Sequence, residues 1–331
     1  MTTPSRTLLI LLLLSLLCAF ALAAAVLCGS SGCFTPGAQA DILWELRMPR
    51  ALSAFAVGGL LALAGALMQV LLRNPLADPY VLGISGGAAS GAMGMMLLAP
   101  AGLVVAGISW SVHLGALLGA LMAIVLLFGL ARGSLLRLAA GPTATPSGIR
   151  LILTGVMIGA GFGALMTLIL SMAPDARLRG MIFWLMGDLE NSLLYAPGLV
   201  VLTAALLWAS MNAPKLNVLA HGDATAQLLG VPVLRLRALA LLVASICTAT
   251  AVAVAGTIGF VGLVVPHALR LVIGNDQRLL LPASALGGGA ALTLADLVAR
   301  SVVAPVQLPV GVVTALIGVP VFLILLARGR T

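Results

Sequence analysis

Apolar segments long enough to cross a bilayer dominate this sequence and leave few other folds open. A helix of about 20 consecutive apolar residues spans the hydrocarbon core of a membrane. Such segments lie at about residues 7–28, 50–72, 80–100, 109–131, 149–171, 192–211, 236–256, 258–273, 281–298 and 309–327. Charged residues make up only 8% of the 331 residues, against about 25% in soluble domains. We therefore expect an all-α integral membrane protein with about ten transmembrane helices in a single bundle, one domain over residues 1–331.

The first apolar segment is predicted to stay in the protein as a helix. Leu8–Leu27 is longer than the apolar core of an ordinary signal peptide, and bulky Leu27 disfavours cleavage before Cys28. The four cysteines are predicted to be small buried apolar side chains, since most of them fall in or at the ends of apolar segments. No disulfide framework is predicted.

The distribution of charge predicts the orientation of the chain. An even number of spans puts both termini on one side, and cytoplasmic loops carry an excess of Lys and Arg. Most of the 17 Lys and Arg residues fall on the side of the termini, and most of the nine Asp and Glu residues fall on the other. We expect a multi-pass protein of a bacterial inner membrane with both termini in the cytoplasm. The net charge of +8 then needs no nucleic acid to explain it.

A polar interruption over residues 212–237 is predicted to be a cytoplasmic loop that carries a short helix. Asp223 is a good N-cap, and Ala224–Leu229 are mostly helix formers. Gly230 supplies a left-handed residue after the helix, and Pro232 cannot continue it. An ordered helix at a loop tip suggests an element that a partner protein grips. The alternative is an ordered surface turn without a partner.

A second loop, residues 171–191, is predicted on the outer side. Met181, Trp184 and Leu185 share one face of its amphipathic middle. This loop is a candidate gate or plug at the membrane surface, with the fifth and tenth spans beside it. The alternative is an interfacial helix anchored by Trp184.

Charged residues near the outer ends of two spans form another candidate site. Arg47 and Arg50 are one helical turn apart, so they are predicted to share a face. Asp296 and Arg300 form an i,i+4 pair, and an acid within a span is a functional candidate by default. The alternatives are a local ion pair and arginines that only anchor helix ends at lipid headgroups. An ion-coupled carrier is disfavoured, because we find no carboxylate near the middle of a span.

Catalytic motifs are scarce. The one lysine, Lys215, is not in a phosphate-binding loop, so any ATP hydrolysis must come from another chain and no cofactor is expected here. Gly83-Ile84-Ser85-Gly86 and His113 match the pattern of an intramembrane serine protease, but packing glycines explain the same residues. His221 and His267 have no metal-ligand spacing with any cysteine, so no metal site is expected.

Four stretches together resemble the FecCD-type permease subunits of ABC importers for iron-siderophores, haem and cobalamin. They are residues 47–91 (RMPRALSAF…NPLADPYVLGISGGAASG), 183–189 (FWLMGDL), 256–300 (GTIGFVGLVVPHALR…LADLVAR) and 308–326 (LPVGVVTALIGVPVFLILL). The resemblance covers nearly the whole chain in order.

The resemblance implies a homodimer with its path at the two-fold axis, two ATP-binding cassette subunits on the cytoplasmic side and a periplasmic binding protein opposite. The cargo it implies is an iron chelate, siderophore or haem, with cobalamin as the alternative. It implies binding-protein docking by Arg47, Arg50 and Arg300. Gate or path residues are predicted at Arg177, Leu178, Met181 and Trp184. The residues implied for ATPase coupling are Leu219, Ala220, Gly222, Asp223, Ala224, Gln227, Leu228, Gly230 and Val231.

Overall fold

The structure is a computed structural model that describes residues 4–30, 32–33, 41–98, 104–105, 108–137, 147–189 and 195–328. Each of the ten predicted apolar segments corresponds to a helix over most of its described residues, which confirms the all-α membrane fold. These helices are α1 (Pro4–Leu27), α2 (Met48–Leu71), α3 (Ile84–Leu98), α4 (Trp110–Arg137), α5 (Ser147–Met172), α7 (Tyr195–Ala220), α9 (Val233–Ala255), α10 (Val261–Ile273), α11 (Gln277–Ser301) and α12 (Val310–Arg328). Among the described residues, seven helices are long and apolar enough to cross a membrane. Helices α3, α10 and α12 are also apolar but have shorter described apolar stretches.

Smaller elements connect these helices. A π-helical turn, η1 (Ile42–Arg47), leads into α2, and a 3₁₀ turn, η2 (Pro79–Leu82), precedes α3. The short helices are α6 (Asp175–Leu185) and α8 (Asp223–Leu228). Two antiparallel hairpins pair β1 (Cys28–Gly29) with β2 (Gly32–Cys33) and β3 (Val104–Val105) with β4 (Ile108–Ser109).

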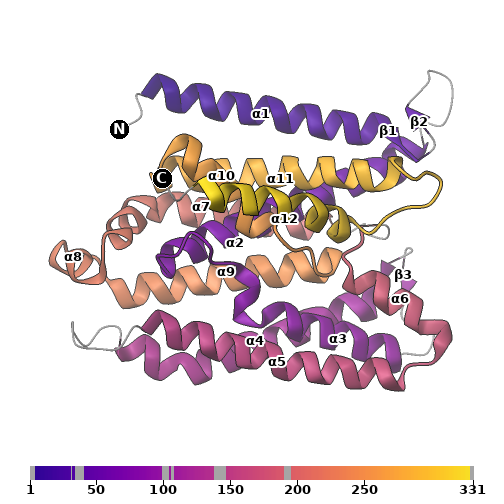
Figure 1. The fold of residues 1–331 in the computed structure, drawn as a ribbon, viewed down its shortest axis with the longest axis horizontal. Helices are drawn as coiled ribbons and strands as arrows, with labels where there is room; N and C mark the ends of the chain where they lie inside the picture. Colours follow the sequence, from indigo (N-terminus) through magenta and orange to yellow (C-terminus); the bar gives the residue numbers. More distant parts are fainter. Residues whose placement is uncertain are drawn as a thin grey trace.

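Helix α2 forms the centre of the bundle. It is buried over most of its length and packs against α11, α9, α7 and α10. Backbones approach closely there: a Cβ added at Gly58 would overlap the carbonyl oxygen of Gly288 on α11. Small residues permit such contacts between membrane helices. Figure 1 shows α1 along one edge of the bundle, next to α11, and α3, α4 and α5 grouped at the opposite edge.

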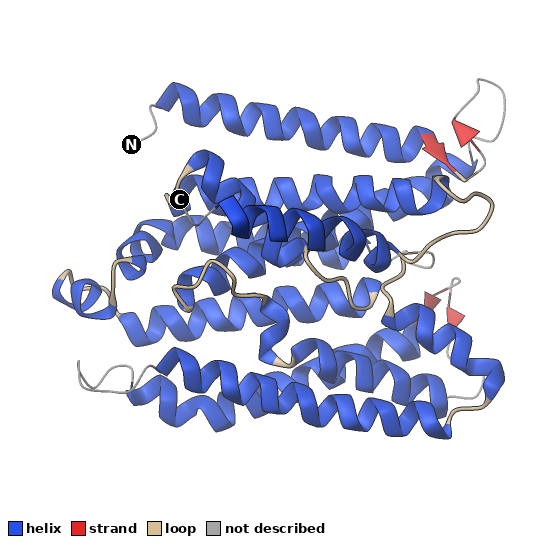
Figure 2. Cartoon of the chain, in the orientation of Figure 1, coloured by secondary structure: helices blue, strands red, loops and turns tan. Residues whose placement is uncertain are grey.

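The polar elements gather at the two ends of the bundle. Helix α8 lies at one end, together with the start of α1 and the end of α12 (Figure 1). Helix α6 and both hairpins lie at the other end, as the strands in Figure 2 show. The predicted outer loop and the charged outer helix ends are therefore separated by the length of the bundle from the predicted loop that carries a short helix.

Helices α3 and α10 begin inside the bundle. Residues 73–83, which we call the re-entrant segment, are exposed from Arg73 to Leu76 and mostly buried from Ala77 onward. The ring of Pro79 lies against Gly262, within 3.0 Å of where a Cβ would stand. Because this segment enters the bundle before α3 starts, α3 needs only 15 residues to reach the end that carries α6.

Two sequence predictions are wrong in detail. The predicted loop over 212–237 is mostly helical, because α7 continues through Pro214 to Ala220 and α9 begins at Val233. Cys28 and Cys33 form a disulfide, because the β1–β2 hairpin brings their Cα atoms within 4.0 Å. Cys18 and Cys247 are free and buried, as predicted.

Candidate functional site

Helix α8 has a different start from the predicted one. Its N-cap is Gly222, without a side-chain hydrogen bond, and Asp223 is the first helical residue. The Asp223 carboxylate is not a cap because it pairs with two cations instead: Arg73 at the start of the re-entrant segment and Arg237 on α9, the latter at 2.8 Å. An acid in a first turn is also favourable next to the positive end of the helix dipole.

The end of α8 agrees with the prediction. Gly230 has φ +74°, a left-handed conformation. Its N–H donates to the Gln227 oxygen at 2.9 Å, and the N–H of Val231 donates to the Ala226 oxygen at 2.9 Å. These two bonds form the Schellman motif that closes a helix. The short helix is therefore a defined structural unit and not a loose connector.

The predicted coupling residues divide by exposure. Ala224, Gln227, Leu228 and Gly230 are exposed, and Leu228 is 89% exposed although it is apolar. Ala220, Gly222, Asp223 and Val231 are half-buried. Leu219 is fully buried in the core, so its side chain supports the loop and is not part of its surface. An ordered helix with an exposed apolar tip has the form of a protein-docking element.

The same end of the bundle is held by a turn between α10 and α11. Asp276 caps α11 by accepting from the Arg278 N–H at 3.0 Å, and it accepts from the Asn217 amide of α7 at 2.7 Å. Partial burial acts to raise the pKa of Asp276, but these two hydrogen bonds and the charge of Arg278 outweigh it and hold that pKa below its ordinary value.

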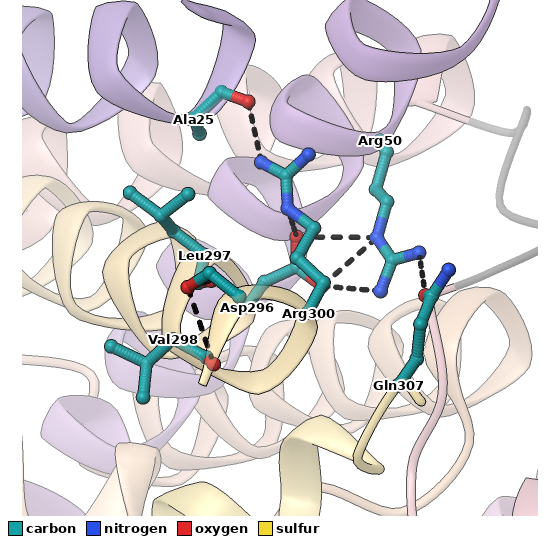
Figure 3. A network of polar contacts seen from close by, with 8 residues as sticks. Ala25, Arg50, Asp296, Leu297, Val298, Arg300 and Gln307 are labelled. Carbon is teal, nitrogen blue, oxygen red and sulfur yellow. Dashed lines mark hydrogen bonds and ion pairs between the residues drawn. The ribbon is translucent and has the colours of Figure 1, made fainter. Parts of the chain in front are cut away.

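At the opposite end, Asp296 lies between two of the predicted docking arginines (Figure 3). Arg50 Nη2 is 2.8 Å from Asp296 Oδ1. Arg300 Nε is 3.3 Å from Asp296 Oδ2, as the i,i+4 spacing of these two residues predicted. Arg50 Nη1 also donates to Gln307 Oε1 at 2.7 Å, and Arg300 Nη2 donates to the backbone oxygen of Ala25 on α1. The Asp296 side chain is fully buried, and those of Arg300 and Arg50 are 4% and 12% exposed.

Arg47 and Arg50 have different hydrogen-bond partners. Arg47 donates to the Leu27 oxygen at 2.8 Å, just before the disulfide-closed hairpin, and to the Gly32 oxygen at 3.1 Å, within that hairpin. Arg47 ends η1, and Arg50 lies in the first turn of α2. The backbone at Arg47 and Met48 is right-handed helical, so the helix continues between the two arginines. The three arginines converge, because Arg300 shares Asp296 with Arg50 and a Cβ at Gly29 would lie within 3.3 Å of both Arg47 and Arg300. Gln307 and the hairpin were not predicted as parts of this site, because only folding brings them near the arginines.

The predicted gate residues lie on α6 and at its junction with α3. Arg177 donates to the oxygens of Met96 and Leu97 at 2.9 and 2.7 Å, so it closes the end of α3. Met181 is fully buried, and Leu178 and Trp184 are half-buried. The face that was predicted from Met181, Trp184 and Leu185 therefore packs onto the bundle.

An open pocket of about 630 Å³ lies beside the end of α6. Its wall is almost entirely apolar. Helix α12 provides much of it, as predicted for the tenth span, whereas none of the described residues of α5 lines it. The lining residues are Leu185, Met186, Thr257, Gly259, Phe260, Gly311, Val312, Ala315, Leu316, Val319 and Pro320. A large apolar surface of this kind suits a bulky molecule that is held by shape.

The geometry disfavours a protease. Gly87 packs on Gly119 and Gly91 packs on Gly115, and these contacts set the register of α3 against α4. In this register, Ser85 and His113 lie at different levels along the two helix axes. His113 Nδ1 contacts the backbone oxygen of Ala253 at 2.6 Å. Among the residues that the structure describes, no group of three His, Cys, Asp or Glu side chains is placed to hold a metal ion.

The fold and the two polar ends define a polytopic helical membrane protein with a short, exposed helix at one end and an apolar pocket. A model of the FecCD transport family matches residues 7–328, so this chain belongs to that family. It is an ABC importer permease, and such permeases are transport subunits that work with ATPase and binding-protein partners.

Known relatives agree with this assignment. The chain is 41% identical to YvrB of Bacillus subtilis, an uncharacterized ABC transporter permease protein, with coverage of 87% of this chain and 79% of the relative. It is 39% identical to BtuC of Escherichia coli (strain HS), a vitamin B12 import system permease protein, with coverage of 90% and 86%. A solved structure described as "an inward-facing conformation of a putative metal-chelate type ABC transporter" is 29% identical with a TM-score of 0.82, over 97% of this chain and 99% of that one.

Proposed function

We propose that this permease moves a bulky metal chelate into the cytoplasm, as a homodimer that two separate ATPase subunits drive. The observation that carries the proposal is the apolar pocket of about 630 Å³ between the end of α6 and α12, because its wall suits a large ligand held by shape. An iron chelate, siderophore or haem, is the cargo that we predicted from sequence. Likeness to a metal-chelate type transporter supports it.

Cobalamin is the second candidate cargo. The 39% identity to BtuC over 90% of this chain supports it, and cobalamin is itself a metal chelate. The cargo is decided by measuring which of labelled cobalamin, haem or ferric siderophore the cognate binding protein captures and the reconstituted complex imports.

In this proposal, the end that carries α8 faces the cytoplasm and grips the ATPase, and the end that carries Arg50 and Asp296 faces the periplasm and the binding protein. The Cys28–Cys33 disulfide supports this orientation, because disulfides persist in oxidising compartments such as the periplasm. The three arginines at this end suit the acidic groups of a partner. Both termini are then cytoplasmic, since they lie at the end with α8.

The test uses the permease with its ATPase and binding protein in proteoliposomes. We expect cargo uptake that needs ATP, and Ala315→Trp should abolish uptake by filling the pocket while the binding protein still docks. Val200→Trp, at an exposed position of α7 away from the pocket lining, is the matched control. Uptake driven by an ion gradient without the ATPase, or full uptake by Ala315→Trp, would contradict the proposal.

A further inference from the structure

We propose that the re-entrant segment, residues 73–83, transmits movement of α8 to the wall of the pocket, with Asp223 and Tyr80 as positioning residues at its two ends. This inference rests on the proposed function, in which the ATPase grips α8. It adds the set of contacts through which movement of α8 is transmitted to the wall of the cargo pocket.

The first link is the ion cluster at α8. Asp223 pairs with Arg73, the first residue of the re-entrant segment, and with Arg237 on α9. Within α8 only Ala226 is buried, so the helix has little apolar contact with the bundle. The Asp223–Arg237 pair is shielded in part from solvent, because these side chains are 24% and 9% exposed, whereas Arg73 is 40% exposed. A displacement of α8 is therefore passed to Arg73 through this cluster.

The second link is the stiffness of the segment. Asn74 Oδ1 accepts from the Leu76 N–H at 2.9 Å, and the Asn74 oxygen accepts from the Ala77 N–H at 3.1 Å. Asp78 caps η2 by accepting from the Tyr80 N–H at 2.7 Å. These local bonds and the two prolines at 75 and 79 restrict the backbone. The segment is thus suited to move as a unit and not to absorb a displacement.

The third link is at the pocket. The Tyr80 hydroxyl donates to the Ile258 oxygen and accepts from the Ile258 N–H, both at 2.9 Å. Ile258 lies between Thr257 and Gly259, and both of these line the pocket. One tyrosine hydroxyl therefore holds the two peptide units on either side of the Ile258 Cα in the pocket wall.

The same wall continues to the end of α6. Thr257 Oγ1 donates to the Leu185 oxygen, and the Asp188 N–H donates to the Ala255 oxygen at 2.9 Å. A Cβ at Gly256 would overlap the Trp184 oxygen, so no side chain separates the two backbones. Contacts are thus continuous from α8 through the re-entrant segment to the pocket and to the predicted gate helix.

A contiguous set of contacts shows transmission only if its two ends are energetically coupled. We therefore choose a double-mutant cycle with Asp223→Asn at one end and Tyr80→Phe at the other. Tyr80→Phe removes only the hydroxyl, and Asp223→Asn keeps the side-chain shape. The full complex in proteoliposomes is assayed for cargo imported per ATP hydrolysed.

We expect each single variant to lower import per ATP several-fold, and the double variant to be no worse than the more severe single one. Asp223→Glu should restore part of the ratio. The controls are Tyr195→Phe, the one other tyrosine, and Asp41→Asn, an exposed acid that precedes η1. Both should keep the wild-type ratio.

Losses that simply multiply in the double variant, or an unchanged ratio in Tyr80→Phe, would overturn the proposal. If Asp223→Asn does not fold, Arg73→Gln replaces it in the cycle with the same expectation. Spin labels at exposed Leu76 and Leu228 provide an independent measurement. Their separation should stay constant between nucleotide-free and ATP-bound states, and a nucleotide-dependent change would also contradict transmission as a unit. Wild-type complex without ATP-driven import would instead contradict the proposed function.

Discussion

Two nitrogens of the Arg50 guanidinium, Nη2 and Nε, donate to the same carboxylate oxygen of Asp296, Oδ1, at 2.8 and 3.0 Å. Asp296 is fully buried, and Arg300 approaches it from the other side. The arrangement joins α2 to α11, and Arg300 extends it to α1 through the Ala25 oxygen. A charge network of this kind holds three helix ends in one geometry.

Removing the Asp296 charge should destabilise the protein strongly. Asp296→Asn leaves two buried guanidinium groups without their anion, and breaking a buried pair costs about 3–5 kcal/mol. We expect a clear drop in the thermal midpoint in detergent. Glu45→Gln, an exposed acid of η1, should leave the midpoint unchanged. Equal midpoints for both variants would show that the network carries little stability.

Docking of the binding protein should depend on Arg47 and Arg50. Arg47→Gln removes a charge at the exposed hairpin, and Arg50→Lys keeps the charge but loses the two-nitrogen geometry. We expect weaker affinity for both variants, and the loss should shrink with added salt for Arg47→Gln. Arg235→Gln, at the opposite end of the bundle, is the control. Unchanged affinity of both variants at low salt would leave these arginines only the role of anchoring helix ends.

Gly230→Val should impair coupling to the ATPase. Gly230 has φ +74°, and no atom lies within 4 Å of an added Cβ, so the penalty is conformational and not steric. A left-handed conformation costs about 1–2 kcal/mol for other residues and more for a β-branched one. We expect a lower ATPase stimulation by loaded binding protein. Gly129→Val, where an added Cβ also meets open space, tests whether any glycine replacement has this effect.

The Cys28–Cys33 disulfide predicts a labelling pattern in intact cells. Without reductant, a thiol reagent that does not cross the inner membrane should label neither cysteine. Cys28→Ser should free Cys33, which is exposed, and allow labelling from the periplasmic side. Cys18 and Cys247 are buried and should stay unlabelled in both proteins. Labelling of Cys33 only after the cells are opened would reverse the proposed orientation.

Cysteines on α6 test the predicted gate. Met181 is fully buried and Leu178 is half-buried, so Met181→Cys should be labelled slowly and Leu178→Cys faster in the state described here. We expect ATP binding to raise the labelling rate of Met181→Cys as α6 moves. Rates that do not respond to nucleotide would favour the interfacial anchor.

The sequence alone determined the all-α fold, the ten apolar segments and the end of α8. These follow from hydropathy over about 20 residues and from the local chemistry of Gly230, which operate within one stretch of chain. The i,i+4 pair of Asp296 and Arg300 was predictable for the same reason.

Tertiary structure decided the partners of the charged groups. Asp223 looked like a cap because Gly222 and the distant Arg73 and Arg237 could not be weighed from local sequence. Arg50 and Asp296 are 246 residues apart, and Tyr80 and Ile258 are 178 apart. A buried charge or hydroxyl takes whichever partner the packing of helices brings within reach, and only the folded bundle sets that packing.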